Sequence, residues 1–217
     1  MKKRYDAVLF DLDGTLLDNH ASFARAFDVM KMLFPETFAQ KQALDLEGMI
    51  ELRRTHETDP EAFLGEYCEK TGWVLERSPQ AFYSFWSSIY LDYPVLYPES
   101  LPLLRYLKDK GYKLGIVTNG NTVSQSRKLR ACGVDELVKV SLISESVGVA
   151  KPDPAIYRMA LDQLGAKVEE SLYVGNNPDT DILGAGNIGM DSFYILGRPQ
   201  TQKPTYSGNL KDLFNLL

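Results

Sequence analysis

The sequence predicts an α/β fold, with a parallel sheet covered by helices on both faces and an all-helical segment inserted after the first strand. Short apolar runs end in polar turns at Ala7–Phe10, Lys113–Val117 and Leu172–Val174, which is typical of buried strands. From residue 100 onward, strand-like runs alternate with helical patterns, as in parallel α/β sheets. Residues 17–95 instead carry apolar residues at helical spacing, with no convincing strand.

Weaker strands are expected near Val138–Ile143 and Phe193–Leu196. Four helical patterns are each closed by a glycine one or two residues beyond their end, and glycine readily closes a helix. They span Leu101–Lys110, Ser124–Cys132, Ala155–Leu164 and Ile182–Asn187. Pro35, Pro60 and Pro79 divide the inserted segment into about four helices.

These patterns divide the chain into two predicted domains. Residues 1–16 and 96–217 form the α/β core, and residues 17–95 form the helical cap. Aromatic residues between positions 82 and 97 recur at helical spacing, which assigns most of them to the core of the cap.

Composition excludes several classes of protein. The net charge of -5 argues against a nucleic-acid binder, which typically carries a basic surface. No stretch is long and apolar enough to span a membrane. The run Ala7–Phe10 is too short for a signal peptide. Cys68 and Cys132 are expected to be free thiols in a reducing compartment. We therefore expect a cytoplasmic protein with neither nucleic-acid nor membrane partners.

Polar side chains follow the three clearest strands. They are Asp11, Asp13, Thr118, Asn119, Asn176, Asp179 and Asp181, and Lys151 comes just after the weaker strand that ends at Ile143. Ligands bind at the carboxyl ends of the strands in an open parallel sheet. If the strands are adjacent, these side chains converge on one small site.

The residue types indicate phosphoryl chemistry assisted by Mg²⁺. Two close carboxylates, Asp11 and Asp13, repel each other by about 1–4 kcal/mol, and a divalent cation relieves that repulsion. One carboxylate can attack phosphorus, and the other can act as general acid and base. Gly14 lets backbone N–H groups approach a phosphate. Thr118 can donate a hydrogen bond to the phosphoryl group, and Lys151 can neutralise its charge.

The order of these segments resembles the haloacid dehalogenase superfamily, in its phosphatase type with a helical C1 cap. The matching motifs are Phe10–Thr15, Val117–Gly120, Gly148–Pro154 and Val174–Ala185. The resemblance spans nearly the whole chain and implies a Rossmann-like core with a mobile helical lid.

The resemblance also implies roles for the residues at the strand ends. Asp11 would be the nucleophile and Asp13 the acid/base. Gly14, Thr118, Asn119 and Lys151 would bind the substrate, a small phosphorylated metabolite. The implied magnesium ligands are Asp11, Asp13, Asn176 and Asp181. One departure weakens that last set, because the family usually has Gly-Asp where this chain has Gly175-Asn176.

Three alternatives to a phosphomonoester hydrolase remain. A haloacid dehalogenase would share Asp11, but it needs no acid/base at Asp13. A phosphosugar mutase typically carries a histidine twelve residues after the nucleophile, where this chain has Phe23. A non-catalytic phospho-ligand-binding protein is the third, and Asn176 gives it some support. The sequence leaves the substrate and the oligomeric state open.

Overall fold

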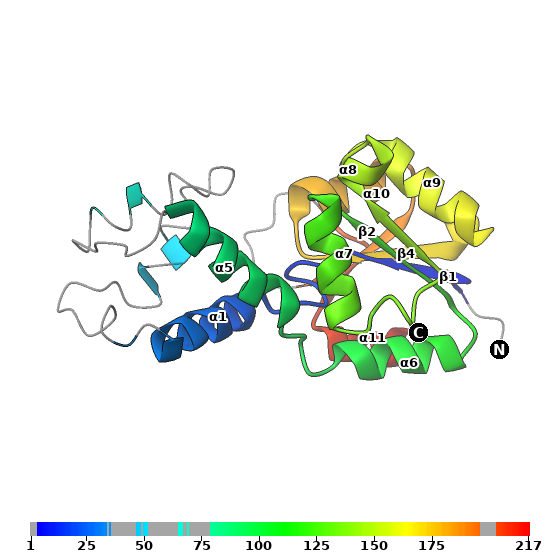
Figure 1. The fold of residues 1–217 in the computed structure, drawn as a ribbon. Coiled ribbons are helices and arrows are strands. Elements are labelled where there is room, and N and C mark those ends of the chain that lie inside the picture. Colours follow the sequence, from blue (N-terminus) through cyan, green and yellow to red (C-terminus); the bar gives the residue numbers. More distant parts are fainter. Residues whose placement is uncertain are drawn as a thin grey trace. The chain divides into compact units, whose positions relative to one another are not determined.

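The computed structural model describes residues 4–33, 35, 47–48, 50–51, 65–66, 69, 79–195 and 203–217. The chain forms two compact units, one of Asn19–Pro94 and one of Met1–Asp18 with Val95–Leu217. The second unit holds the sheet (Figure 1). Every described residue from 19 to 92 is helical, so the predicted fold class, a parallel α/β core with a helical insertion, is confirmed.

Six parallel strands form one sheet in the order β3-β2-β1-β4-β5-β6. The strands are β1 (Ala7–Phe10), β2 (Lys113–Thr118), β3 (Val140–Ile143), β4 (Ser171–Gly175), β5 (Asp191–Ile195) and β6 (Tyr206–Gly208). Ala7 of β1 is in register with Lys113 of β2 on one side and Ser171 of β4 on the other. The strand order reverses between β1 and β4, and such a switch point places a crevice at the carboxyl ends of the strands.

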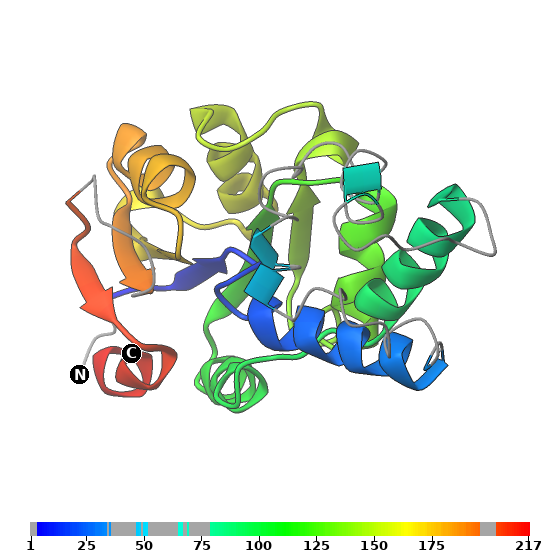
Figure 2. The same cartoon turned by 90° about the vertical axis from the view of Figure 1, so that its left-hand side faces the viewer.

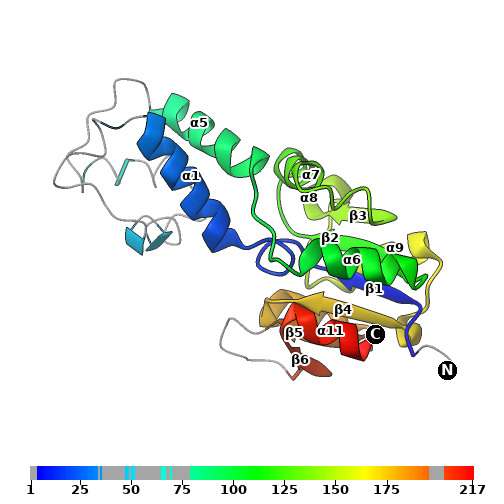
Figure 3. The same cartoon turned by 90° about the horizontal axis from the view of Figure 1, so that it is seen from below.

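Helices cover both faces of this sheet (Figures 1 and 3). Figures 2 and 3 show α6 and α11 together on one face, with α9 and α10 on the other. Their bounds are α6 Ser100–Asp109, α9 Pro154–Leu164, α10 Leu183–Asn187 and α11 Leu213–Leu216. The remaining elements of this unit are α7 (Thr122–Ala131), α8 (Ser144–Val147), the 3-10 turns η1 (Val168–Glu170) and η3 (Leu210–Asp212), and the π-helical turn η2 (Pro178–Ile182).

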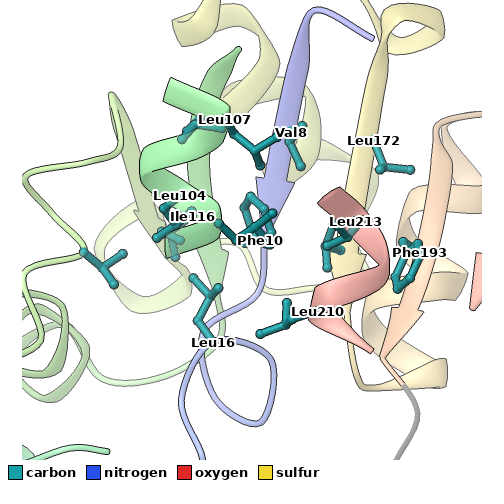
Figure 4. Packing of buried hydrophobic residues seen from close by; sticks show 14 of the residues in the cluster. Val8, Phe10, Leu16, Leu104, Leu107, Ile116, Leu172, Phe193, Leu210 and Leu213 are labelled. Carbon is teal, nitrogen blue, oxygen red and sulfur yellow. The ribbon is translucent and has the colours of Figure 1, made fainter. Parts of the chain in front are cut away.

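The central strand β1 is buried on both faces, which explains its unbroken apolar run. Val8 and Phe10 belong to the cluster under α6 and α11, where Leu104 and Leu213 are also fully buried (Figure 4). Ala7 and Leu9, by contrast, join the cluster under α9. Burying each large side chain contributes roughly 1.5–3 kcal/mol, so the position of β1, and of the residue that follows it, is firmly fixed.

Within the helical unit, α1 (Asn19–Leu33) lies beside α5 (Pro79–Asp92). Phe23 and Trp86 are both buried, and their ring centroids are 4.9 Å apart. Ile89 is buried on the same helix as Trp86, whereas Phe85 is 40% exposed. For Trp86, the assignment of the aromatic residues to the core of the cap is therefore confirmed.

Hydrogen bonds join the two chain segments at the border of the sheet unit. Asp18 N–H donates to the Val95 carbonyl at 2.8 Å, and Tyr97 N–H donates to the Leu16 carbonyl at 3.0 Å. The Ser100 hydroxyl donates to that same Leu16 carbonyl at 2.8 Å. The outgoing and returning segments are thus fastened together before the chain enters the helical unit.

Two local predictions differ from the structure at their ends. The predicted helix Ile182–Asn187 matches α10 except at Ile182, which is the last residue of the π-helical turn. The predicted strand Phe193–Leu196 begins earlier, at Asp191, and Leu196 lies outside the described residues. β6 and α11 carry too few residues for a recognisable period. No helix in the described part of the chain is long and apolar enough to cross a membrane.

Candidate active site

Three buried charged side chains meet at the carboxyl end of β1. Lys151 Nζ donates to Asp11 Oδ1 and to Asp181 Oδ1, both at 2.7 Å. The side chains of Asp11, Lys151 and Asp181 are 9%, 3% and 0% exposed. The predicted convergence of strand ends therefore holds for these residues, which are far apart in sequence.

Burial and charge act against each other in this cluster. Burial raises the pKa of Asp11 to about 7; the Lys151 ammonium lowers that pKa, and the Asp181 carboxylate raises it. The pKa of Lys151 is raised above its usual value, because the two carboxylates outweigh the effect of burial. Lys151 therefore stays positively charged. One ammonium between two carboxylates cannot balance both, so the cluster favours a further cation.

Tyr173 on β4 completes the surroundings of Lys151. Its hydroxyl accepts a hydrogen bond from Lys151 Nζ at 3.0 Å and donates to the Val117 carbonyl at 3.0 Å. Burial raises the pKa of Tyr173 well above its ordinary value, so this hydroxyl keeps its proton. The ammonium of Lys151 is thus held at three points.

The loop that carries Lys151 is tied to the end of β2. Asn119 Oδ1 accepts from the Lys151 N–H at 2.8 Å, and Asn119 Nδ2 donates to the Lys151 carbonyl at 2.9 Å. Asp153 then caps α9 by accepting from the Ala155 N–H. Pro154 occupies the first turn of that helix, where a backbone N–H would have no partner within the helix. The Lys151–Pro152 peptide bond is cis.

Asp181 lies in the π-helical turn after β4. Its Oδ2 accepts from the Asn177 N–H at 2.9 Å, and Asn177 Oδ1 in turn accepts from the N–H groups of Asp179 and Thr180. Gly175 is needed for this approach, because a Cβ there would overlap the Asp181 side chain.

The turn after β1 places the Thr15 hydroxyl near both Asp11 and Asn176, the residue that follows β4. The Thr15 hydroxyl lies 3.3 Å from Asp11 Oδ2 and 3.4 Å from Asn176 Oδ1, so the two oxygens face one hydroxyl group. Gly14 has φ +80°, and a Cβ at this position would collide with the Asn176 amide. Only glycine satisfies both the backbone angle and the contact.

Asp13 points to a different set of partners. Lys128 Nζ contacts Asp13 Oδ1 at 2.8 Å and Oδ2 at 3.1 Å. Gln125 Nε2 donates to Asp13 Oδ2 at 2.8 Å and to Thr118 Oγ1 at 2.7 Å. Both partners lie on α7, whose first turn is capped by the Asn121 side chain.

Comparison with known proteins agrees with this geometry. The model of the haloacid dehalogenase-like hydrolases matches residues 5–189, which include every side chain of the cluster. The chain belongs to this family of hydrolases.

Two relatives of this haloacid dehalogenase-like hydrolase are glyceraldehyde 3-phosphate phosphatases. The one from Methanopyrus kandleri is 40% identical over 54% of this chain and 50% of its own length. The one from Pyrococcus furiosus is 30% identical over 89% of this chain and 81% of its own length. The match to the first of these relatives thus spans only half of that protein.

Solved structures share the fold over the full length. The HAD-hydrolase YfnB from Bacillus subtilis, bound to magnesium, has a TM-score of 0.76 and 24% identity, and the match covers 99% of both chains. A dehalogenase has a TM-score of 0.72 and 26% identity, and the match covers 100% of this chain and 99% of the other. This fold is therefore shared with a dehalogenase as well as with a magnesium-bound HAD-hydrolase, and the fold by itself does not identify the reaction.

The side chains of this hydrolase fit a magnesium ion in part. Among the described residues, Asp11 Oδ2 and Asn176 Oδ1 accept only long hydrogen bonds, both from Thr15, so both oxygens could also coordinate a metal ion. Within the described ranges, no three His, Cys, Asp or Glu side chains form a group that could hold a metal ion by themselves. Magnesium suits such a site, because it commonly takes one or two carboxylates and keeps several waters.

The structure brings most of the predicted residues together, but in two groups. Asp11, Asp181 and Lys151 form one, and Asn176 joins it through Thr15. Asp13 and Thr118 form the other, around Gln125. The side-chain amide of Asn119 uses both its oxygen and its nitrogen in hydrogen bonds to the Lys151 backbone.

Sequence reasoning did not single out Thr15, Gln125, Lys128 or Tyr173. A signal existed for two of them. Gln125 and Lys128 are three residues apart on a predicted helix, which puts them on one face. That helix directly follows the strand ending in Thr118, so one face of it was a candidate to line the site.

Proposed function

We propose that this protein is a phosphomonoester hydrolase for a small phosphorylated metabolite, with Asp11 as the covalent nucleophile. One observation carries the proposal: the Asp11 carboxylate lies at the switch point of the sheet and is held by a buried lysine that also holds Asp181. A carboxylate fixed in this way can attack an electrophile that enters at the strand ends.

The reaction has two steps. In the first, an Asp11 oxygen forms a bond to phosphorus while the bond to the leaving oxygen breaks, and the Asp13 carboxyl gives its proton to that oxygen. In the second, the Asp13 carboxylate takes a proton from water as the water oxygen attacks phosphorus. The acyl phosphate bond then breaks, which frees Asp11 and inorganic phosphate.

The other predicted residues bind charge on the phosphoryl group. Lys151 supplies a permanent positive charge beside Asp11, and Thr118 supplies a hydroxyl at the end of β2. Asp11 and Asn176 would hold magnesium, which when bound neutralises charge on the phosphoryl oxygens. The predicted parts of Asp13 and Asp181 in metal binding have less support. Both oxygens of Asp13 contact α7 side chains, and those of Asp181 contact Lys151 Nζ and the Asn177 N–H.

Two observations favour a phosphatase over the rival reactions. A dehalogenase needs no acid/base at position 13, whereas Asp13 is present and held by two side chains of α7. At the position where mutases typically have a histidine, Phe23 is 7% exposed and packs against Trp86. Phe23 therefore serves the core of the helical unit and cannot exchange protons.

The relatives named above support a choice of substrates for the first assays. Both are glyceraldehyde 3-phosphate phosphatases, so a panel should begin with that ester. Sugar phosphates, phosphoglycolate and nucleoside monophosphates complete it. If, with magnesium present, the protein hydrolysed neither these esters nor p-nitrophenyl phosphate, the non-catalytic alternative would remain.

The direct test is Asp11→Asn. An amide of the same shape cannot form the acyl phosphate, so we expect turnover to be abolished. Trapping of ³²P on wild-type protein after acid quench, but not on the variant, would identify the nucleophile. A variant that retained even a tenth of the wild-type kcat would rule out Asp11 in that role.

A further inference from the structure

Gln125 is a buried amide between two parts of the candidate site. It is 3% exposed and lies in the second turn of α7. Its Nε2 reaches Asp13 Oδ2 at 2.8 Å and Thr118 Oγ1 at 2.7 Å. An amide nitrogen carries two hydrogens, and here one is available for each of these two oxygens.

Lys128 holds the same carboxylate from one helical turn further along. It contacts both oxygens of Asp13, at 2.8 and 3.1 Å, and its side chain is only 9% exposed. The Asp13 side chain, at 27% exposed, keeps one side open. Three short contacts from one helix therefore define the rotation of the carboxyl group about its Cβ–Cγ bond.

The hydrogen bond from Gln125 affects where the hydrogen of the Thr118 hydroxyl can point. A hydroxyl has one hydrogen to donate, and here its oxygen accepts from Gln125. Among the described residues, the acceptor for the Thr118 hydrogen is the Asn119 carbonyl, at the long distance of 3.4 Å. The hydrogen is thus poorly engaged and can be given to a phosphoryl oxygen with little loss.

We propose that Gln125 and Lys128 are positioning residues, which set Asp13 for proton transfer and Thr118 for phosphate binding. The inference rests on the proposed function. Neither residue needs to touch the substrate. Because catalytic groups displaced by about 1 Å lose about 10²-fold in rate, a helix that holds two of them in register has a direct effect on turnover.

The test uses two aryl phosphates of similar size, p-nitrophenyl phosphate and p-methoxyphenyl phosphate, with magnesium present. The methoxyphenolate is the poorer leaving group and depends more on the proton from Asp13. General acid–base catalysis contributes about 10²–10⁴-fold, so partial misplacement should cost about tenfold more on the methoxy ester. We expect this selective loss in Gln125→Met and in Lys128→Met.

A double-mutant cycle separates positioning from general damage. In an Asp13→Asn background, Gln125→Met and Lys128→Met should no longer change the ratio of the two rates, because there is no acid left to position. Lys128→Arg should restore much of the ratio by keeping the charge. Arg130→Met is the matched control, since Arg130 is an exposed cation on the same helix, and it should change neither rate.

Gln125→Asn is a milder variant for the case in which Gln125→Met does not fold. Its amide is one methylene shorter and loses reach to both oxygens. Equal losses on the two esters, or a Gln125→Met effect that persists without Asp13, would overturn the inference while leaving the proposed function intact. A wild-type protein that hydrolyses neither aryl ester nor any phosphorylated metabolite of the panel would overturn both.

Discussion

Lys151 is the residue on which the charge balance of the site depends. Its ammonium lies between two buried carboxylates, and both contacts are 2.7 Å long. Removing one member of a buried ion pair typically costs about 3–5 kcal/mol, because the partner charge is left in a poor solvent. We therefore expect Lys151→Met to lower the midpoint of thermal unfolding strongly, and added magnesium to recover part of that loss.

The matched control is Lys113→Met. Lys113 also forms a 2.8 Å ion pair, with Asp6, and donates to the Gly165 carbonyl at 2.7 Å, but both of these contacts are exposed, with the Lys113 and Asp6 side chains 36% and 47% exposed. An exposed pair is worth about 0–1 kcal/mol, so this variant should unfold almost as wild type does. Equal destabilisation of the two variants, measured by calorimetry, would mean that the buried charge of Lys151 does not hold the cluster together.

Asn176 offers a test of where the ion binds. Its Oδ1 shares the Thr15 hydroxyl with Asp11 Oδ2, and it contributes no charge. A carboxylate about 4 Å from a divalent ion gains roughly 2–8 kcal/mol before desolvation, and a net gain on the order of 1 kcal/mol is several-fold in affinity. Asn176→Asp should therefore lower the magnesium concentration needed for half-maximal activity and for half-maximal thermal stabilisation.

Asn177→Asp provides the same change in net charge one residue further on. Asn177 Oδ1 caps the π-helical turn, and a carboxylate can keep that role. We expect this control to shift the magnesium midpoint less than Asn176→Asp does. If Asn176→Asp needs as much magnesium as wild type, Asn176 is not beside the ion.

The residues at the strand ends could be predicted because parallel strands place their carboxyl ends on one edge. Asp11, Lys151 and Asp181 needed only the correct order of elements. Gln125 and Lys128 required the rotation of α7 about its own axis, which depends on packing with distant residues. The polar character of that helix offers no single apolar stripe from which to read the rotation.

At the scale of the element, the turn after β1 depends on a single glycine. Gly14 has φ +80°, and a Cβ there would also meet the Asn176 side chain. Gly165, at the end of α9, has φ +58° with open space around it. Left-handed backbone costs a residue with a Cβ roughly 1–2 kcal/mol. We expect Gly14→Ala to cost clearly more than Gly165→Ala and to reduce activity, whereas Gly165→Ala should leave activity unchanged.

The two alanine variants can be compared by urea unfolding and by kcat/KM on p-nitrophenyl phosphate. The difference between their unfolding free energies isolates the contact with Asn176, since both carry the backbone strain. Asn176→Ala added to Gly14→Ala should remove part of that difference. Equal costs for the two glycine variants would show that the turn has room for a methyl group.

Element prediction succeeded where apolar periods were long and failed where elements were short. β1, β2 and β4 were predicted from buried runs, and α9 from its period and its closing glycine. β6 has three residues, Tyr206–Gly208, and α8 has four, Ser144–Val147; neither length can show a period. The π-helical turn at Pro178–Ile182 forms around Asp181, and its extra residue per turn cannot be read from hydrophobic spacing.

At the scale of the whole molecule, the predicted lid requires motion where the chain passes between its two units. The hinges of such a lid are expected near residues 15–20 and 92–98, where the chain enters and leaves the inserted segment. Within those ranges, hydrogen bonds join Asp18 to Val95 and Tyr97 to Leu16, and these bonds resist bending. Motion should therefore concentrate just beyond them, at the unit borders 18–19 and 94–95, because hinges are short segments that absorb the backbone change.

Hydrogen exchange on the full chain tests this directly. Magnesium with tetrafluoroberyllate mimics a phosphoryl group on Asp11, and magnesium alone is the reference. The amides of Asp18 and Tyr97, already bonded to carbonyl groups, should exchange slowly in both states. Residues next to the unit borders, and one face of the helical unit, should gain protection only with the mimic.

The control is Asp11→Asn, which cannot carry the mimic and should show no such gain. Protection at the strand ends without any change in residues 19–94 would contradict the lid and leave substrate recognition to the sheet unit alone.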